Sequence, residues 1–264
     1  MTRNQLLASQ KVVNEQQTIE DRLEGSLMRP RQAATARTMA ARPLLDRIDC
    51  WIFDLDNTLY SPKADLFGQI DVKMGQFIQQ LLGCDAAEAR RVQKGFFHDH
   101  GTTLAGLMMR HDVEPRSFLD FVHDIDLGVL DPQPDLADAL ARLPGRKLVF
   151  TNGDEPYARR VLDRLGVAEQ FAAVHDIIAC DYVPKPQPDA YARLIEAHDI
   201  VPEQSLFVED MARNLEPAKA LGLTTIWVNN GSERGSHGAD PAFIDHEIND
   251  VGDWLTEILG VNAA

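Results

Sequence analysis

Two aspartates, Asp54 and Asp56, stand one residue apart directly after the apolar run Cys50–Phe53. One carboxylate in such a position can attack phosphorus beside a metal ion, and the other can exchange protons with the leaving group and with water. A polar turn that closes a strand would use the same residue types, since Asp, Asn and Thr are ordinary turn formers. The pair therefore predicts phosphoryl chemistry in combination with further groups.

A second polar motif, Thr151-Asn152-Gly153, follows the apolar run 147–150. A hydroxyl and backbone N–H groups at a strand-to-helix turn can bind phosphoryl oxygens. Lys185 lies between two prolines, and a point cation of this kind suits charge that develops on a transferring phosphoryl group. A commonplace turn and a surface lysine remain the alternatives when each motif is taken alone.

The last motif is Glu209-Asp210, which closes the apolar run 205–208. Two acids at a strand end can hold a divalent cation, and hard oxygen ligands suit Mg²⁺. The alternative is a polar strand end followed by a helix cap. The four motifs occur in the order nucleophile, hydroxyl, cation and metal site, and each follows an apolar run.

Elements that could position these residues alternate along the chain. Runs at 50–53, 147–150, 205–208 and 224–228 are typical of buried strands, and 177–180 indicates a fainter one. Amphipathic helical segments separate them. This alternation predicts an α/β fold, a Rossmann-like parallel sheet flanked by helices, whose motifs meet at the carboxyl edge of the strands.

Residues 62–133 break the alternation and predict helices only, so we expect an inserted α-helical cap domain there. The α/β core domain is expected to comprise 48–61 and 134–264. Residues 1–47 are expected to form a disordered or partly helical N-terminal extension; within them, residues 1–42 hold seven Lys/Arg against four Asp/Glu. A targeting arm and a synthesis start at Met28 or Met39 stay open as alternatives.

Composition narrows the classes of partner. The chain has 264 residues and a net charge of −15, which argues against binding to nucleic acid or to an anionic membrane. No apolar run approaches the ~18 residues of a membrane span. The first residues do not show a basic-then-apolar pattern, so we do not expect secretion. Three widely spaced cysteines favour a reducing cytoplasm. We expect a monomer or homodimer that acts on a small phosphorylated substrate.

Across residues 48–230 the motifs and their order resemble the haloacid dehalogenase (HAD) superfamily. The resemblance implies that Asp54 is the nucleophile and Asp56 the general acid and base. It also implies that Thr151 binds the phosphoryl group and that Lys185 neutralises its charge. An acid at position 56 argues for a phosphatase, because expulsion of halide needs no proton whereas an alkoxide-like leaving group does.

The same resemblance implies a Mg²⁺ site. Its ligands would be the Asp54 carboxylate, the Asp56 backbone carbonyl and Asp210. Glu209 would contact the ion through a water molecule or would contact its ligands instead of the ion.

A narrower resemblance, to the pyrimidine 5′-nucleotidase branch, rests on the strings 53–60, 101–108, 122–126 and 150–154. It implies hydrolysis of nucleoside monophosphates such as UMP and CMP. Phe96-Phe97 and Tyr157 depart from the Tyr-Tyr and His of that branch. Thr102 and Thr103 are expected either to meet the substrate or to cap a helix.

Other functions fit the same motifs. A sugar-phosphate phosphatase or a phosphomutase would share all four, and a non-catalytic binding protein would keep the scaffold. For a phosphonate-cleaving enzyme, no lysine of the 62–133 segment stands out as a Schiff-base former.

Overall fold

The computed structural model describes residues 45–260. The expected extension 1–47 lies almost wholly outside the described residues, as do the last four residues. The described residues 45–260 lie in one compact unit.

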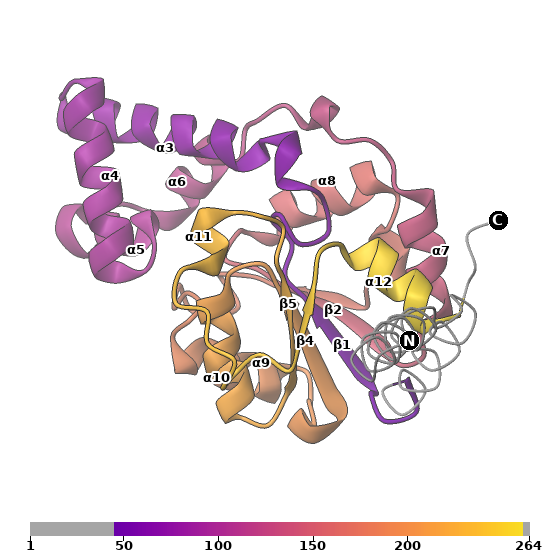
Figure 1. Cartoon of the computed structure of the whole chain (residues 1–264). Helices are drawn as coiled ribbons and strands as arrows, with labels where there is room; N and C mark the ends of the chain where they lie inside the picture. The colour runs from indigo at the N-terminus through magenta and orange to yellow at the C-terminus, as the bar shows by residue number, and fades with distance from the viewer. Residues whose placement is uncertain (1–44, 261–264) are drawn as a thin grey trace, which may run out of the picture. The chain divides into compact units, whose positions relative to one another are not determined.

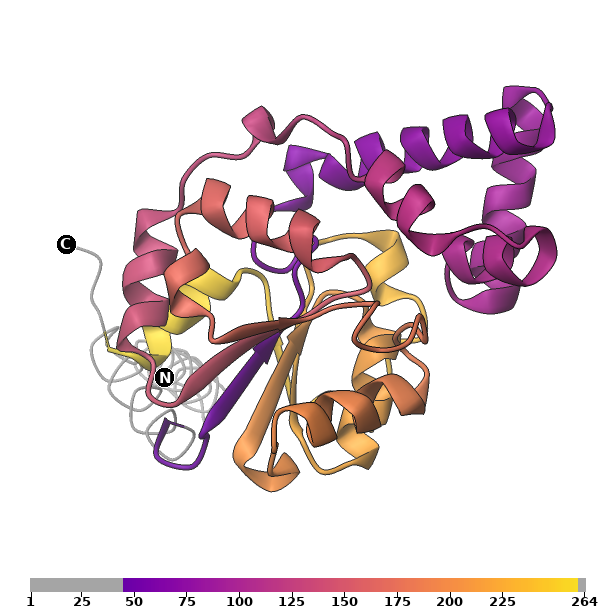
Figure 2. The same cartoon turned by 180° about the vertical axis from the view of Figure 1, so that it is seen from behind.

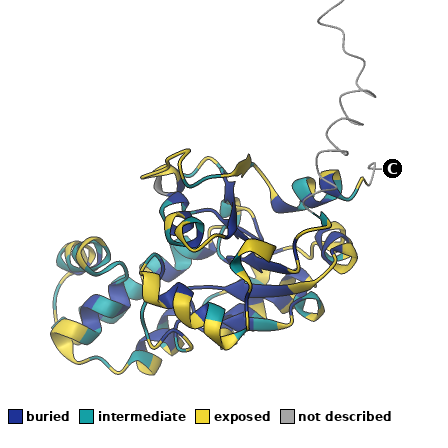
Figure 3. Ribbon diagram, turned by 90° about the horizontal axis from the view of Figure 1, so that it is seen from below, coloured by how far each residue is buried: buried dark blue, intermediate teal, exposed yellow. Residues whose placement is uncertain are grey.

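A six-stranded parallel sheet forms the centre of this unit, with the order β3-β2-β1-β4-β5-β6 (Figure 1). The prediction of a parallel α/β sheet is confirmed. Strands β1, β4 and β5 are buried along their whole length because apolar side chains point to both faces. Figure 3 shows the centre of the fold largely in the dark blue of buried residues. The strands are β1 Cys50–Phe53, β2 Arg146–Phe150, β3 Ala173–His175, β4 Ser205–Glu209, β5 Thr224–Val228 and β6 His246–Ile248.

Helices cover both faces of the sheet (Figures 1 and 2). One face carries α7 Pro134–Arg142, α8 Glu155–Leu165 and α12 Val251–Ile258, and the other carries α9 Pro188–Ala197 and α10 Leu215–Ala220. A cluster of buried side chains that includes Phe150, Tyr191 and Phe207 fills the layer under α9 and α10. The ring centroids of Phe150 and Tyr191 are 5.2 Å apart, edge to face.

Only helices occur among the elements described between residues 62 and 129. They are η1 Pro62–Ala64, α3 Leu66–Leu82, α4 Ala86–His100, α5 Thr103–His111, α6 Pro115–Val122 and η2 Leu127–Val129. The Asp85 carboxylate caps α4 by accepting the Glu88 N–H. Gly101 ends α4 at φ 82°, and the Thr102 hydroxyl oxygen caps α5 through the Ala105 N–H.

The predicted strand at 177–180 is wrong. β3 lies just before it, and 177–180 form turns because the Asp176 carboxylate accepts the N–H groups of Ala179 and Glu155. The short helices η3 Ala168–Gln170, η4 Pro202–Gln204, η5 Ala212–Asn214 and α11 Glu233–Ser236 complete the fold. Within residues 45–260, no helix has the length and apolar character that a membrane span needs. The three cysteines are unpaired.

Candidate active site

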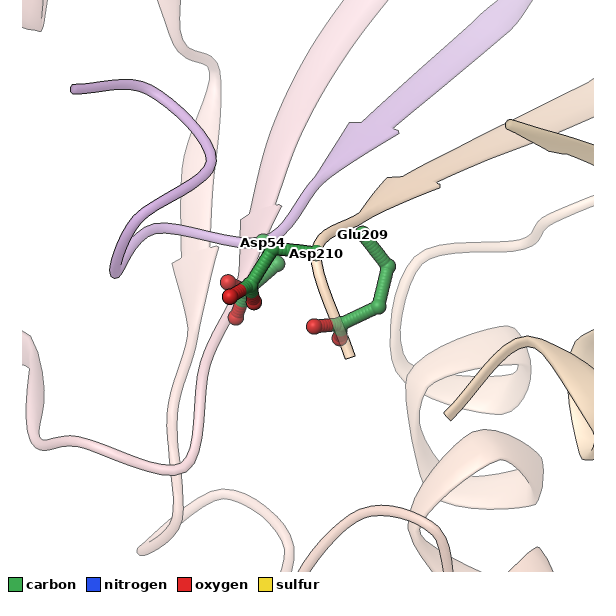
Figure 4. A group of neighbouring side chains, drawn as sticks. All are labelled: Asp54, Glu209 and Asp210. Atoms are coloured by element: carbon green, nitrogen blue, oxygen red, sulfur yellow. The ribbon is translucent and has the colours of Figure 1, made fainter. Parts of the chain in front are cut away.

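Three buried acids meet where the two central strands end. Asp54 directly follows β1, Glu209 is the last residue of β4, and Asp210 comes next. Their carboxylate oxygens lie within 4.8 Å of one another, and Figure 4 shows the side chains converging from the two strand ends. The site lies at the switch point of the sheet, since the chain passes from β3 at one edge back to β4 beside β1.

Lys185 enters this cluster from the loop between β3 and α9. Its Nζ donates to Asp54 Oδ1 at 2.7 Å, to Glu209 Oε2 at 2.7 Å and to the Phe150 carbonyl at 2.8 Å. The ammonium group also lies 5.0 Å from the Phe150 ring centroid. All three hydrogens of the ammonium group are therefore used, and the lysine neutralises only part of the negative charge.

The remaining charge alters proton affinities. Burial, together with the charge of Glu209, raises the pKa of Asp54 to about 7, although Lys185 opposes this. Burial and the charges of Glu209 and Asp54 raise the pKa of Asp210 to about 10. Burial alone would lower the pKa of Lys185, but the charges of Asp54 and Glu209 raise it. The folded chain thus holds more carboxylate than its own cation can balance.

This donor set fits a hard divalent cation. Both Glu209 oxygens are already engaged, Oε2 with Lys185 and Oε1 with the Met211 N–H at 3.0 Å. Both Asp54 oxygens are engaged as well, Oδ1 with Lys185 and Oδ2 with the Thr58 hydroxyl, so a bound cation would share them with these donors. Asn214 lines the same cavity, and its Oδ1 is a buried acceptor without a partner in the described part of the chain. Oxygen donors of this kind suit Mg²⁺.

Thr58 links the two acids, a contact that the sequence motifs did not reveal. Its hydroxyl donates to Asp54 Oδ2 at 3.1 Å and accepts the Asp210 N–H at 3.1 Å. The threonine thereby fixes the spacing between the ends of β1 and β4.

The Thr151-Asn152-Gly153 turn follows β2 and lines the same cavity. The Thr151 hydroxyl oxygen accepts the Gly153 N–H at 2.9 Å. Asn152 contacts the backbone of Lys185 twice: its Oδ1 accepts the lysine N–H at 2.8 Å and its Nδ2 donates to the lysine carbonyl at 3.2 Å. The Asn152 side chain therefore holds the lysine loop in place.

Asp56 is held by two tyrosines that pattern reasoning did not connect with it. Its Oδ1 accepts the Tyr60 hydroxyl at 2.5 Å and the Tyr157 hydroxyl at 2.7 Å. Tyr157 lies on α8, 101 positions along the chain from Asp56. No local spacing signals this contact, since the fold alone brings α8 over the end of β1.

A cavity of about 550 Å³ opens on these groups and extends into the helical segment. Asp54, Asp56, Lys185 and Asp210 line its lower part. Thr102 and Thr103 also line it, so the structure brings both cap threonines to the same cavity as the acids. Apolar residues form much of its upper wall, among them Ile70, Met74, Phe97, Leu104 and Leu119.

Comparison with known proteins agrees with this geometry. The profile of the haloacid dehalogenase-like hydrolases matches residues 48–222, which is most of the chain. The chain belongs to the haloacid dehalogenase-like hydrolases. The match begins just before β1 and ends after α10, so it takes in every strand end that carries a candidate group.

Individual relatives of this hydrolase differ in activity. It is 25% identical over 190 residues to phosphate metabolism protein 8 of Saccharomyces cerevisiae, a match to 66% of this chain and 59% of the yeast protein. It is 32% identical over 125 residues to phosphoglycolate phosphatase of Escherichia coli, covering 45% of this chain and 48% of that enzyme. It is also 32% identical over 96 residues to (S)-2-haloacid dehalogenase of Xanthobacter autotrophicus, covering 36% of this chain and 38% of the dehalogenase.

Solved structures share the fold of this hydrolase. A HAD phosphatase from Thermococcus onnurineus superposes with a TM-score of 0.55 at 20% identity, covering 82% of this chain and all of that one. The HAD hydrolase YfnB from Bacillus subtilis, solved with bound magnesium, has a TM-score of 0.53 at 16% identity, covering 81% and all of that chain.

The positions at which this hydrolase departs from the nucleotidase-like strings differ in their surroundings. Phe96 packs inside the helical segment, 5.8 Å from the His111 ring, and does not line the cavity. Phe97 lines the cavity, and the Arg213 guanidinium lies 4.9 Å from its ring centroid. Tyr157 contacts Asp56 directly. Two of the three departures therefore lie at the site.

Proposed function

We propose that this hydrolase is a Mg²⁺-dependent phosphomonoester hydrolase that forms an aspartyl-phosphate on Asp54. The observation that carries the proposal is the excess of buried carboxylate, three acids against one lysine, beside a separate acid at Asp56. Halide expulsion needs neither a proton donor nor a cation, whereas phosphoryl transfer uses both.

The reaction follows from the placement of the side chains. A carboxylate oxygen of Asp54 attacks phosphorus, the P–O bond to the leaving group breaks, and Asp56 gives its proton to the departing oxygen. Water then attacks the phosphorus of the aspartyl-phosphate and gives a proton to Asp56, which frees Asp54 and releases inorganic phosphate. A Mg²⁺ ion on Asp54, the Asp56 carbonyl and Asp210 would supply charge neutralisation when bound.

Lys185 and the turn after β2 support the same reaction. Lys185 already contacts the nucleophile at 2.7 Å, so it lies where negative charge enters the phosphoryl group. The Thr151 hydroxyl lines the cavity and can donate to a phosphoryl oxygen, since its hydrogen bond with Gly153 uses it only as an acceptor.

For the substrate we propose a nucleoside 5′-monophosphate, with UMP and CMP as the first choices. A cavity of about 550 Å³ with an apolar upper wall has room for a nucleoside. Arg213 also lines the cavity, and its guanidinium lies 4.9 Å from the Phe97 ring centroid. The N–H groups of this guanidinium can donate to a carbonyl oxygen of a base. The runner-up is a sugar phosphate, which fits the same phosphoryl site.

A panel of phosphate esters with and without Mg²⁺ tests the proposal. The panel should hold the four common nucleoside monophosphates, several sugar phosphates, phosphoglycolate, p-nitrophenyl phosphate and 2-chloropropionate. We expect Mg²⁺-dependent phosphate release, fastest from UMP or CMP, and none from the Asp54→Asn variant.

The outcomes of this panel separate the alternatives. Halide release without phosphate release would contradict the proposed chemistry. Faster release from sugar phosphates would change the substrate and keep the mechanism. No release from any ester would favour a binding protein, and isomerisation of a sugar phosphate would favour a mutase.

A further inference from the structure

Asp56 has an unusual pair of neighbours, because two tyrosine hydroxyls donate to the same oxygen, Oδ1. Tyr60 lies in the loop after β1, and Tyr157 lies on α8. Both tyrosines are buried, with exposed fractions of 6% and 1%. Burial, followed by the charge of Asp56, raises the pKa of both phenols well above their usual range, so both remain protonated donors.

The hydrogen bonds leave the two oxygens of Asp56 in different situations. Oδ1 receives both hydroxyls, while Oδ2 receives no hydrogen bond from the described residues. Since Asp56 lines the cavity, Oδ2 is the oxygen that can exchange a proton with a substrate. Two donors on one oxygen also restrict the rotation of the carboxylate more than a single hydrogen bond would.

Tyr157 is itself held from the helical segment. The His123 ring, at the end of α6, stacks on the Tyr157 ring with centroids 4.3 Å apart and planes 11° apart. His123 Nδ1 lies 2.8 Å from Asp154 Oδ1, and the same oxygen accepts the Tyr157 N–H at 3.3 Å. Burial would raise the pKa of Asp154, but the hydrogen bond and charge of His123, the Tyr157 N–H and the charge of Arg116 together lower it.

We propose that Tyr60 and Tyr157 are positioning residues that hold Asp56 ready for proton transfer through Oδ2, with His123 fixing the Tyr157 ring. The inference rests on the proposed role of Asp56 as general acid and base. The proton passes from Oδ2 to the leaving oxygen and returns to Oδ2 from water in the second step. The tyrosine protons stay on their hydroxyls and transfer nowhere.

Leaving-group dependence tests this inference, because only a poor leaving group needs the proton from Asp56. The variants are Tyr60→Phe, Tyr157→Phe and the double variant, with Asp56→Asn as reference. Tyr182→Phe is the matched control, since Tyr182 has no contact with Asp56 and does not line the cavity. Each is assayed with p-nitrophenyl phosphate and with the alkyl phosphate that the wild type cleaves fastest.

We expect each single variant to lower kcat/KM for the alkyl phosphate about 10- to 100-fold, the size of one hydrogen bond to a charged group. The value for p-nitrophenyl phosphate should fall less than about threefold, because nitrophenolate leaves without help. The double variant should approach Asp56→Asn, and Tyr182→Phe should match the wild type. If a tyrosine variant fails to fold, His123→Ala is assayed in its place. We expect it also to lower kcat/KM more for the alkyl phosphate than for p-nitrophenyl phosphate.

Two results would overturn the inference. In the first, the tyrosine variants lose equal activity on both substrates, or lose none, while Asp56→Asn is inactive. This result would exclude the positioning role and leave the proposed function intact. Full activity of Asp56→Asn on the alkyl phosphate would overturn the proposed role of Asp56 and this inference together.

Discussion

Asp54→Asn should make the metal-free protein more stable at neutral and alkaline pH, although it removes the proposed nucleophile. Asn has nearly the same shape as a protonated Asp, so the variant mimics the neutral form of Asp54. Burial and Glu209 raise the pKa of Asp54 from its ordinary 3.8 to about 7. The folded chain thus holds the proton more tightly than the unfolded chain, and stability falls as pH rises between these values.

The size of the effect follows from the shift. Each pKa unit corresponds to 1.36 kcal/mol, so the difference between 3.8 and about 7 corresponds to about 4 kcal/mol. Below pH 4 the wild type and the variant should have equal free energies of unfolding. Above pH 7 the variant should be more stable by about 4 kcal/mol, and the gap should open between these values.

Urea unfolding at several pH values between 4 and 8, in EDTA, measures the gap. Taking the difference between the two proteins cancels groups that titrate in both, such as His175, whose pKa burial lowers to about 4. Adding Mg²⁺ should stabilise the wild type at pH 8 and leave the variant little changed, since the variant lacks one ligand. Parallel curves across the whole pH range would show that folding does not raise the pKa of Asp54.

Three further substitutions give separate outcomes. Lys185→Met should abolish phosphatase activity and lower the free energy of unfolding at pH 8 by about 3 to 5 kcal/mol, because it leaves two buried carboxylates unpaired; urea unfolding with a loss below about 1 kcal/mol would contradict this. Arg213→Met should raise KM for the best nucleotide about tenfold at constant kcat, and Arg193→Met, an exposed control, should not; equal KM values would exclude Arg213 from the binding site. Gly145→Ala should lower stability by more than about 1 kcal/mol in thermal unfolding at unchanged kcat, because φ is +74° and a Cβ would lie 2.3 Å from the Asp49 carbonyl oxygen. Gly83→Ala, strained at φ +62° but with open space around it, should cost less.

Most of the sheet is predictable from the sequence because its central strands are continuous apolar runs. The edge strand β6 was missed, since His246 and Glu247 are exposed and give no apolar pattern. The turns at 177–180 resembled a strand in composition, and the Asp176 hydrogen bonds that decide between the two are visible only in three dimensions.

The groups at the strand ends can also be predicted from the sequence, because a parallel sheet brings the ends of its strands to one edge. Contacts between distant segments cannot be predicted in this way. Thr58 between Asp54 and Asp210, Asn152 on the Lys185 backbone and Tyr157 on Asp56 all join residues that no periodicity relates. The Tyr157 and Asn152 contacts depend on how α8 and the loop before α9 pack over the sheet, and Thr58 meets Asp210 because β1 pairs with β4.

Trapping the covalent intermediate would identify the nucleophile itself. The wild-type protein is mixed with Mg²⁺ and its best phosphate ester, quenched with hydroxylamine and digested, and the peptide that contains Asp54 is analysed by mass spectrometry. We expect a hydroxamate on Asp54 that forms only with both substrate and Mg²⁺ and is absent from Asp54→Asn. Turnover with an unmodified Asp54, or a hydroxamate on another carboxylate, would contradict it.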